Sequence, residues 1–476
     1  MNKQKYLIKN VGILTISNFA SKILVFLLVP LYTSVLSTSE YGTADLLVST
    51  ISIFTPLLTL NIVDAVMRFT MDEKYDKRDV FSAGEYFTII SIAIVFIFLL
   101  INHFGDFSLL IKKYELFIFF SYLFGTGNNL LTQFAKGLEK IKEMGIAGVI
   151  GTVSTISLNV FFLLVIKLGL NGYLFTMICA SLIQFIYLFI SLKIWKFHRF
   201  SIYPVVFTKE MLIYCVPLLA TTIGWWINSA ADRYVVTFLV GVSATGLVSV
   251  SYKIPQIINT LQSIFIQAWQ ISAIKEYGEQ DTAIFYGKTF KVINFLMCAA
   301  CSWLILLTRP LAHILYAKDF YVAWKFVPFL LISSVLNCAS GLLGPILSAK
   351  KDSKSMMWSA IFGAIVNVGL NILLVFFMGI QGATISTAIA SFIIYIIRKR
   401  AVGKDIIIDG YFIVIATWIG LCIQAIIEVY FKSYLLEIFI MFVLLCVNFN
   451  SFKNIVVSFG GLIKSIKKDN KIKNDK

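Results

Sequence analysis

Apolar stretches of about 20 residues recur along the whole chain, and this recurrence restricts the protein to one class of fold. A helix of that length crosses the hydrocarbon core of a bilayer, where the backbone must satisfy its own hydrogen bonds. The chain has 476 residues, of which 59% are hydrophobic and 14% are charged. Soluble domains have about 45–50% apolar and about 25% charged residues. The sequence therefore predicts an all-α membrane protein.

We expect about fourteen transmembrane helices, one for each apolar stretch. The predicted spans are residues 9–34, 43–66, 82–102, 115–135, 145–166, 172–194, 211–238, 245–269, 289–308, 326–348, 356–378, 381–398, 407–430 and 434–450.

Parts of the first half of the sequence are repeated in outline in the second half. Residues 150–165 match residues 362–377, and the match then continues two residues out of step. The matched pairs are Gly151 and Gly363, Asn159 and Asn371, Gly169 and Gly379, Gly172 and Gly382, Ser39 and Ser243, and Gly42 and Gly246. Such repeats are typical of secondary transporters, in which one half moves against the other.

The repeat predicts a division of the chain into four parts. We expect six-helix bundles over residues 1–200 and 201–404. Two additional transmembrane helices follow over residues 405–450, and a basic cytoplasmic tail covers residues 451–476.

The net charge of +16 is distributed as in a membrane protein. Most of the 41 Lys and Arg residues fall in alternate loops, which predicts that those loops and both termini lie in the cytoplasm. The basic tail is expected to contact anionic membrane lipids, and we expect no nucleic-acid partner.

The sequence gives no sign of catalysis. It contains no nucleotide-binding Gly-x-x-x-x-Gly-Lys-Ser/Thr loop, and its three histidines lie in separate loops without metal-site spacing. A membrane glycosyltransferase or polymerase would need a sizeable acidic loop outside the bilayer, and the loops here are short. We therefore expect neither an enzyme nor a bound cofactor or metal.

Polar side chains at bilayer depth are the candidates for a binding site, because an ionisable group there costs about 2.5 kcal/mol or more. In the first span, Asn18 and Lys22 lie on one helical face. In the second, Asp64 and Arg68 are one turn apart and can pair, although Arg68 can also extend to the headgroups. Glu428, near a helix end, is expected at the membrane interface.

Two further clusters lie in the seventh and eighth spans. The seventh contains Trp225, Trp226, Asn228, Asp232 and Arg233. The last two are adjacent, so we expect them to have different partners. The eighth carries a predicted polar stripe formed by Lys253, Gln256, Thr260, Ser263 and Gln267.

These positions predict a cationic cavity. The candidate binding residues are Lys22, Arg68, Arg233 and Lys253, and the candidate coupling or ion-pairing acids are Asp64 and Asp232. Candidate sugar contacts are Asn18, Trp225, Trp226, Asn228, Gln256 and Gln267, although the tryptophans equally fit packing roles. Such a cavity suits an anionic cargo, because Arg and Lys bind phosphate strongly.

Several segments resemble prokaryotic polysaccharide flippases, the Wzx-type O-antigen flippases among them. Residues 30–42 resemble the end of their first helix and the following turn, residues 136–140 a loop, and residues 217–233 and 241–253 their seventh and eighth helices. The resemblance extends to multidrug exporters and oligosaccharidyl-lipid flippases of one superfamily. It implies a central cationic cavity, with Asp232 and Arg233 as the first positions to carry over.

The resemblance also implies the function. We expect movement of an undecaprenyl-pyrophosphate-linked oligosaccharide across the bacterial inner membrane for O-antigen, capsule or exopolysaccharide synthesis. A polysaccharide polymerase and chain-length machinery are expected partners. The alternatives are a cation-coupled multidrug exporter, for which the cationic cavity is unfavourable, and a flippase for the peptidoglycan precursor.

Overall fold

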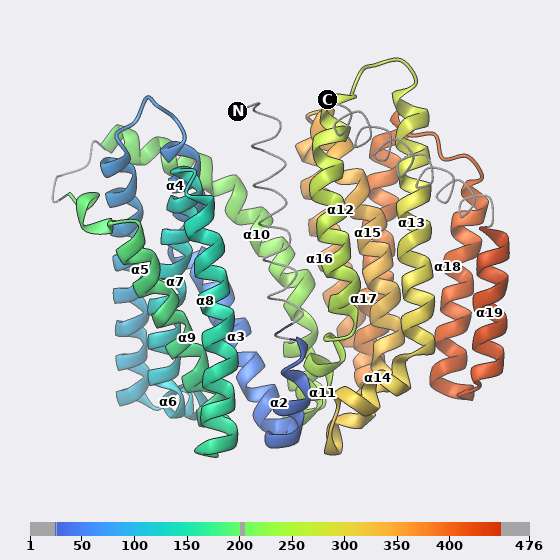
Figure 1. Ribbon diagram of the computed structural model, residues 1–476, viewed down its shortest axis with the longest axis horizontal. Helices are drawn as coiled ribbons and strands as arrows, with labels where there is room; N and C mark the ends of the chain where they lie inside the picture. Colours follow the sequence, from blue (N-terminus) through green and yellow to red (C-terminus); the bar gives the residue numbers. More distant parts are fainter. Residues whose placement is uncertain (1–23, 25, 200–204, 449–476) are drawn as a thin grey trace, which may run out of the picture. The chain divides into compact units, whose positions relative to one another are not determined.

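The computed structural model describes residues 24, 26–199 and 205–448, and helices joined by short turns dominate this part of the chain (Figure 1). It packs as two compact units. The first extends to Ser249 and includes Leu315–Phe320, and the second comprises Val250–Ile314 and the chain from Tyr321 onward.

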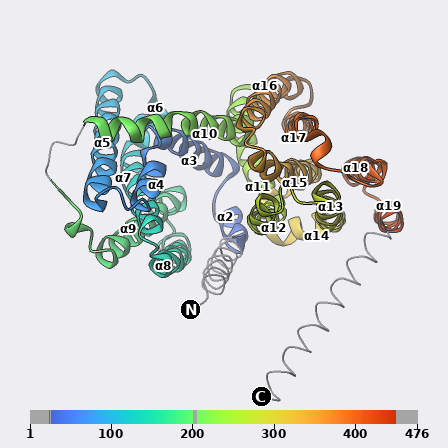
Figure 2. The ribbon, with the colours of Figure 1, turned by 90° about the horizontal axis from the view of Figure 1, so that it is seen from above.

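The first unit contains α2 (Val29–Val35), α3 (Thr38–Leu58), α4 (Ile62–Thr70), α5 (Lys77–Gly105), α6 (Leu109–Lys113), α7 (Glu115–Gly137), α8 (Ile141–Asn159), η1 (Val160–Val165), α9 (Gly169–Ser191), η2 (Ile194–Lys196), α10 (Val205–Leu239) and most of α11 (Val242–Ser251). Seen from above, α3 and α10 lie side by side within this unit (Figure 2).

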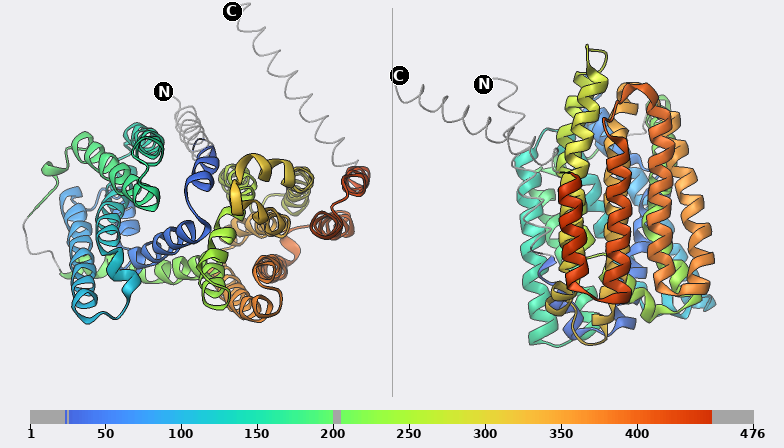
Figure 3. Two further views of the ribbon diagram at one scale, coloured as in Figure 1. Left: turned by 90° about the horizontal axis from the view of Figure 1, so that it is seen from below. Right: turned by 90° about the vertical axis from the view of Figure 1, so that its right-hand side faces the viewer.

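The second unit contains α12 (Pro255–Lys275), α13 (Thr282–Leu306), most of α14 (Thr308–Leu315), part of η3 (Lys318–Phe326), α15 (Val327–Ala349), α16 (Ser353–Met378), α17 (Ile380–Val402), η4 (Gly403–Asp405), α18 (Tyr411–Ile426), η5 (Ile427–Phe431) and α19 (Tyr434–Val447). The last two α-helices, α18 and α19, are adjacent (Figure 3).

The helices agree with the predicted spans. Every predicted span on the described residues coincides with one helix or with two consecutive ones. Residues 9–23 and 25 of the first span and 449–450 of the last lie outside the described residues. Nine helices in the described ranges are long and apolar enough to cross a membrane. Helix α10 is bent by 42°, and the number is ten if its two parts are counted together as one span. The all-α membrane fold is confirmed.

The boundary between the units differs from the predicted boundary between bundles. Because α10 packs against α3 and α4, residues 205–249 belong to the first unit. The six-helix bundles over 1–200 and 201–404 and the separate helices over 405–450 therefore remain predictions. The basic tail over 451–476 lies outside the described residues.

The matched positions of the repeat have the same local structure in both units. Gly169 and Gly379 each have a positive φ, at 55° and 59°, just where α9 and α17 begin. Asn159 and Asn371 are both buried, at 1% and 0% exposure. This agreement supports the repeat.

The two-residue offset in the match has a structural counterpart. The first half contains the π-helix η1 and a turn with Lys167 at φ 60°, whereas α16 stays α-helical to Met378. A π-helical turn contains more residues than an α-helical turn, so it absorbs additional residues without ending the helix.

Asp352 caps the start of α16. Its carboxylate accepts hydrogen bonds from the Ser355 hydroxyl at 2.7 Å and the Ser355 backbone N–H at 3.0 Å. The same two bonds lower the pKa of Asp352.

We expect Asp352→Ala to destabilise the protein by about 1 kcal/mol, the usual contribution of a helix cap. Because the folded-state pKa is lowered, the stabilisation is present above the unfolded pKa of about 3.9 and is lost as the pH falls through the folded value. Thermal unfolding against pH, with Asp352→Asn as the control, measures this effect. An alanine variant as stable as wild type at neutral pH would contradict the capping role.

Candidate functional site

The junction of α3, α10 and α11 in the first unit contains the candidate site. Helix α3 begins with a capping box, in which Glu40 N–H donates to the Ser37 hydroxyl at 3.2 Å and Ser37 N–H donates to the Glu40 carboxylate at 2.8 Å. The Cβ of an alanine at Gly42 would overlap the Val242 carbonyl oxygen and lie 2.8 Å from the Gly246 nitrogen. Only glycine allows the two helices to approach this closely.

An ion pair lies beside this contact. Arg233 of α10 donates from Nε to the Asp45 carboxylate of α3, and the Ser249 hydroxyl of α11 donates to the same oxygen at 2.6 Å. Arg233 Nη1 also donates to the Ser229 carbonyl oxygen at 2.6 Å. The Asp45 and Arg233 side chains are 23% and 17% exposed, so a part of each lies at the protein surface.

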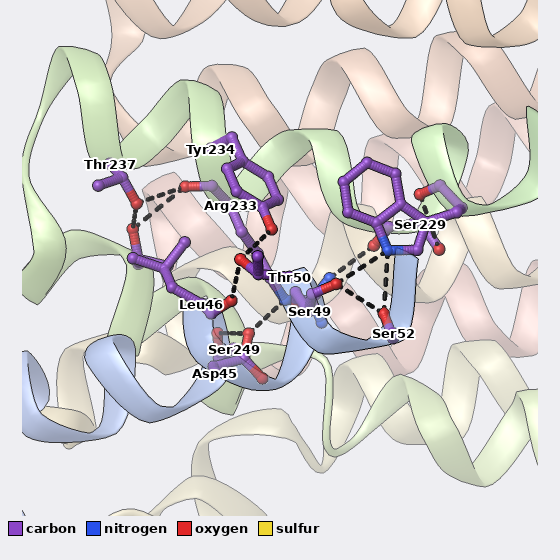
Figure 4. A network of polar contacts seen from close by, with 12 residues as sticks. Asp45, Leu46, Ser49, Thr50, Ser52, Ser229, Arg233, Tyr234, Thr237 and Ser249 are labelled. Atoms are coloured by element: carbon purple, nitrogen blue, oxygen red, sulfur yellow. Dashed lines mark hydrogen bonds and ion pairs between the residues drawn. The ribbon is translucent and has the colours of Figure 1, made fainter. Parts of the chain in front are cut away.

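Hydroxyl contacts extend the network on both sides of the ion pair (Figure 4). Thr50 and Tyr234 are hydrogen-bonded at 2.8 Å, and Thr237 and Thr245 at 2.7 Å.

The indole of Trp226 makes a further connection between α10 and α3. Its Nε1 donates to the Ser49 carbonyl oxygen at 3.1 Å and lies 3.0 Å from the Ser52 hydroxyl. The network therefore fixes one face of α10 to one face of α3 by directional bonds.

This arrangement can bind an anion by exchange. The guanidinium of Arg233 is held in a fixed orientation, and a phosphate group can replace the Asp45 carboxylate as its acceptor. The Asp45 carboxylate would then need a proton, a cation or a new donor besides Ser249, so anion binding would alter the packing of α3 against α11. The network thus combines charge recognition with a helix contact.

A second polar group in the first unit surrounds Asp64. Its carboxylate accepts hydrogen bonds from Asn61 at 2.8 Å and from Gln133 of α7 at 3.1 Å. Arg68 is exposed on the next turn of α4. The spacing allows an ion pair between Asp64 and Arg68, but the described part of the chain contains no such pair. Two side-chain amides are thus the hydrogen-bond partners of this carboxylate.

The other candidates on α10 have varied environments. Asp232 is 1% exposed, and Trp225 is 45% exposed. Asn228 donates to the Gly224 carbonyl oxygen within its own helix at 3.1 Å. Arg233 pairs with Asp45 of α3.

The predicted polar stripe of the eighth span is interrupted. Helix α11 ends at Ser251 and α12 begins at Pro255, so Lys253 lies in the turn and not on the helix that carries Gln256. Pro255 stands at the start of α12, a position favourable to proline because no intrahelical N–H donor is needed there. A continuous helical face from Lys253 onward was therefore a wrong prediction.

Three of the predicted positions have no described side chain. Asn18 and Lys22 lie outside the described residues. Gln267 lies in α12, but its side chain is also outside the described part. Gln256 is exposed at the start of α12, and Lys253 is half-buried.

The sequence interpretation missed Asp45 and Ser249. A signal for Asp45 was present, because Asp45, Ser49 and Ser52 follow one another at intervals of four and three residues on one face of α3. Asp45 stands near the start of a predicted span, where an acidic residue commonly faces the headgroups, so this signal alone does not indicate a site.

The sequence matches the family described as "Polysaccharide biosynthesis protein" over residues 7–270. The chain belongs to this family. A search of curated protein sequences finds no match.

Solved transporter structures have the same fold. The lipid II flippase MurJ, in an inward closed conformation, has a TM-score of 0.69 at 16% identity and covers 93% of this chain and 99% of its own. An inward-facing multidrug resistance MATE family transporter of the MOP superfamily has a TM-score of 0.64 at 14% identity, covering 81% and 95%. A MOP superfamily transporter from Pyrococcus furiosus has a TM-score of 0.59 at 14% identity, covering 83% and 96%.

The chain thus belongs to a polysaccharide biosynthesis family and has the fold of multi-span membrane transporters. Its resemblance to polysaccharide flippases is confirmed at the level of family and superfamily.

Proposed function

We propose that this transporter moves an undecaprenyl-pyrophosphate-linked oligosaccharide from the cytoplasmic to the outer face of the bacterial inner membrane. The family match over residues 7–270 is the observation that supports this substrate class most directly, because its description places the family in polysaccharide biosynthesis. A lipid II flippase and multidrug transporters both have this fold, so the substrate class depends on the family match.

In this proposal, Arg233 is the described residue that binds the pyrophosphate of the cargo. Its guanidinium is partly accessible and is oriented by Asp45 and the Ser229 carbonyl oxygen. The pyrophosphate of the cargo competes with Asp45 for this group, and release of the cargo restores the resting ion pair. We retain Lys22, Arg68 and Lys253 as further phosphate-binding candidates, and Asp64 and Asp232 as candidate coupling sites.

The remaining parts of the proposal concern topology and partners. Both termini lie in the cytoplasm, as the distribution of basic residues favours. Trp225, Trp226, Asn228 and Gln256 are the described candidates for sugar contacts. A polysaccharide polymerase and chain-length machinery would receive the cargo on the outer face.

A second candidate is a flippase for the peptidoglycan precursor, favoured by the TM-score of 0.69 with the lipid II flippase. Both cargoes carry a pyrophosphate and a polyprenyl chain, so an Arg233 site suits either one. The sugar portion must distinguish them.

Proteoliposomes containing the purified full-length protein test the proposal. We expect protein-dependent flipping of a fluorescent undecaprenyl-pyrophosphate oligosaccharide at a rate at least about tenfold above that of lipid II, a difference of about 1.4 kcal/mol between the two transition states. Protein-free liposomes are the control. Equal or faster flipping of lipid II would favour the second candidate, and efflux of a cationic dye without lipid flipping would contradict both.

A further inference from the structure

Two glutamates of the last helices meet one arginine inside the second unit. Arg309 of α14 donates from Nε to both Glu428 oxygens at 3.0 Å, and its Nη2 lies 2.8 Å from Glu428 Oε2. The same Nη2 donates to Glu437 Oε1 of α19 at 3.3 Å. Both glutamate side chains are 0% exposed, and that of Arg309 is 16% exposed.

Glu428, which the sequence predicts at the membrane interface, is buried among protein side chains. The π-helix η5 and the partner on α14 place its carboxylate inside the protein. Neither feature can be read from the residues around Glu428.

Few other charged groups lie near this cluster. The aromatic ring of Tyr434 in α19 has its centroid 4.1 Å from Arg309 Cζ. Lys432, which follows η5, is exposed and has its Nζ 5.8 Å from the Trp324 ring centroid. On α14 and η3 the further acidic and basic side chains are all exposed, namely His313, Lys318, Asp319 and Lys325. Within the described ranges, Arg309 is the cation within ion-pairing distance of either carboxylate.

The charges of the cluster therefore do not balance. One guanidinium faces two carboxylates, so full ionisation would leave a net negative charge on groups that water does not reach. Burial of an uncompensated charge costs several kcal/mol, roughly the penalty of removing one ion from water. Moreover, Glu437 Oε2 is buried and has no hydrogen-bond partner among the described residues.

We propose that Glu428 and Glu437 hold one proton between them and thereby form a proton-binding site that joins α18 and α19 to α14. The proton is taken from water and returned to it. When the proton is bound, one carboxylate pairs with Arg309 and the other is a neutral carboxylic acid. If the proton is on Glu437 Oε2, this oxygen becomes a hydrogen-bond donor. When it is lost, two negative charges share one cation and the contact weakens.

A proton suits the cluster better than a metal ion. Metal cations need several oxygen ligands around one centre, and the groups of the described part of the chain that could act as ligands form no such set. Here the guanidinium already occupies the position between the two carboxylates. The same reasoning disfavours sodium.

Infrared spectroscopy of the purified full-length protein in nanodiscs tests the proposal directly. We expect a protonated-carboxyl stretching band at neutral pH that disappears at alkaline pH. Glu437→Gln and Glu428→Gln should each abolish this band, because the remaining carboxylate and Arg309 then form a neutral pair. Glu276→Gln, at an exposed position of the same unit, should leave the band unchanged.

Thermal unfolding against pH supplies an independent measurement. Where the folded protein holds a proton that the unfolded chain does not, the folding constant falls about tenfold per pH unit as the pH rises. As the pH rises, the folding constant of the wild-type protein should therefore fall more steeply than that of Glu437→Gln. A spectrum without a glutamate-dependent band, or stability that follows sodium concentration instead of pH, would overturn the proposal.

Discussion

Alanine at Gly42 or at Gly246 is expected to prevent accumulation of folded protein. A Cβ at Gly42 would overlap the Val242 carbonyl oxygen, and one at Gly246 would overlap the Thr38 carbonyl oxygen. The obstructing atoms belong to helix backbones, which cannot rotate away as a side chain can. Separation of α3 from α11 would also break the hydrogen bond between Asp45 and Ser249.

The measurement is the yield of monodisperse protein after detergent extraction, followed by its thermal unfolding. Gly125→Ala in α7 is the matched control, because a Cβ there meets nothing within 4 Å. That variant should be as stable as wild type or slightly more stable, since alanine favours a helix by about 1 kcal/mol over glycine. Normal yield and stability of Gly42→Ala would show that the two helices need no direct backbone contact.

The contact between Gly42 and Gly246 also shows what sequence comparison can and cannot supply. The two glycines were matched as equivalent positions of a repeat, and the structure places them against each other in a reciprocal way. The match in sequence predicted similar local structure. It did not predict contact, because nothing in either segment specifies the distance between them.

The partners of the polar residues could not be predicted from local sequence either. Arg233 was a candidate because it is charged within an apolar span and lies in a segment that resembles polysaccharide flippases. Its partner Asp45 is 188 residues away in the chain, and only the packing of α10 against α3 brings the two together. The burial of Glu428 was not predicted for the same reason, since its partner Arg309 is 119 residues away. Local patterns predict helices and faces, whereas the partners of buried charges depend on the complete fold.

The second large effect concerns the ion pair between Asp45 and Arg233. Arg233→Gln should reduce both thermal stability and flipping of the lipid-linked oligosaccharide, because it leaves the Asp45 carboxylate without its cation. The cost of breaking such a pair is about 3–5 kcal/mol when it is fully buried and less at these exposures of 23% and 17%. Asp45→Asn should reduce stability for the corresponding reason. Arg78→Gln, at an exposed position of α5, is the control.

The double variant Asp45→Asn with Arg233→Gln separates a structural role from a binding role. It removes both charges, so no unpaired ion remains and stability should recover toward the wild-type value. If Arg233 binds the pyrophosphate, flipping should remain at least about tenfold below wild type, because a neutral amide replaces a charge-assisted contact. Recovery of both stability and flipping would instead show that the pair only joins α3 to α10, and the phosphate-binding role of Arg233 would have to be abandoned.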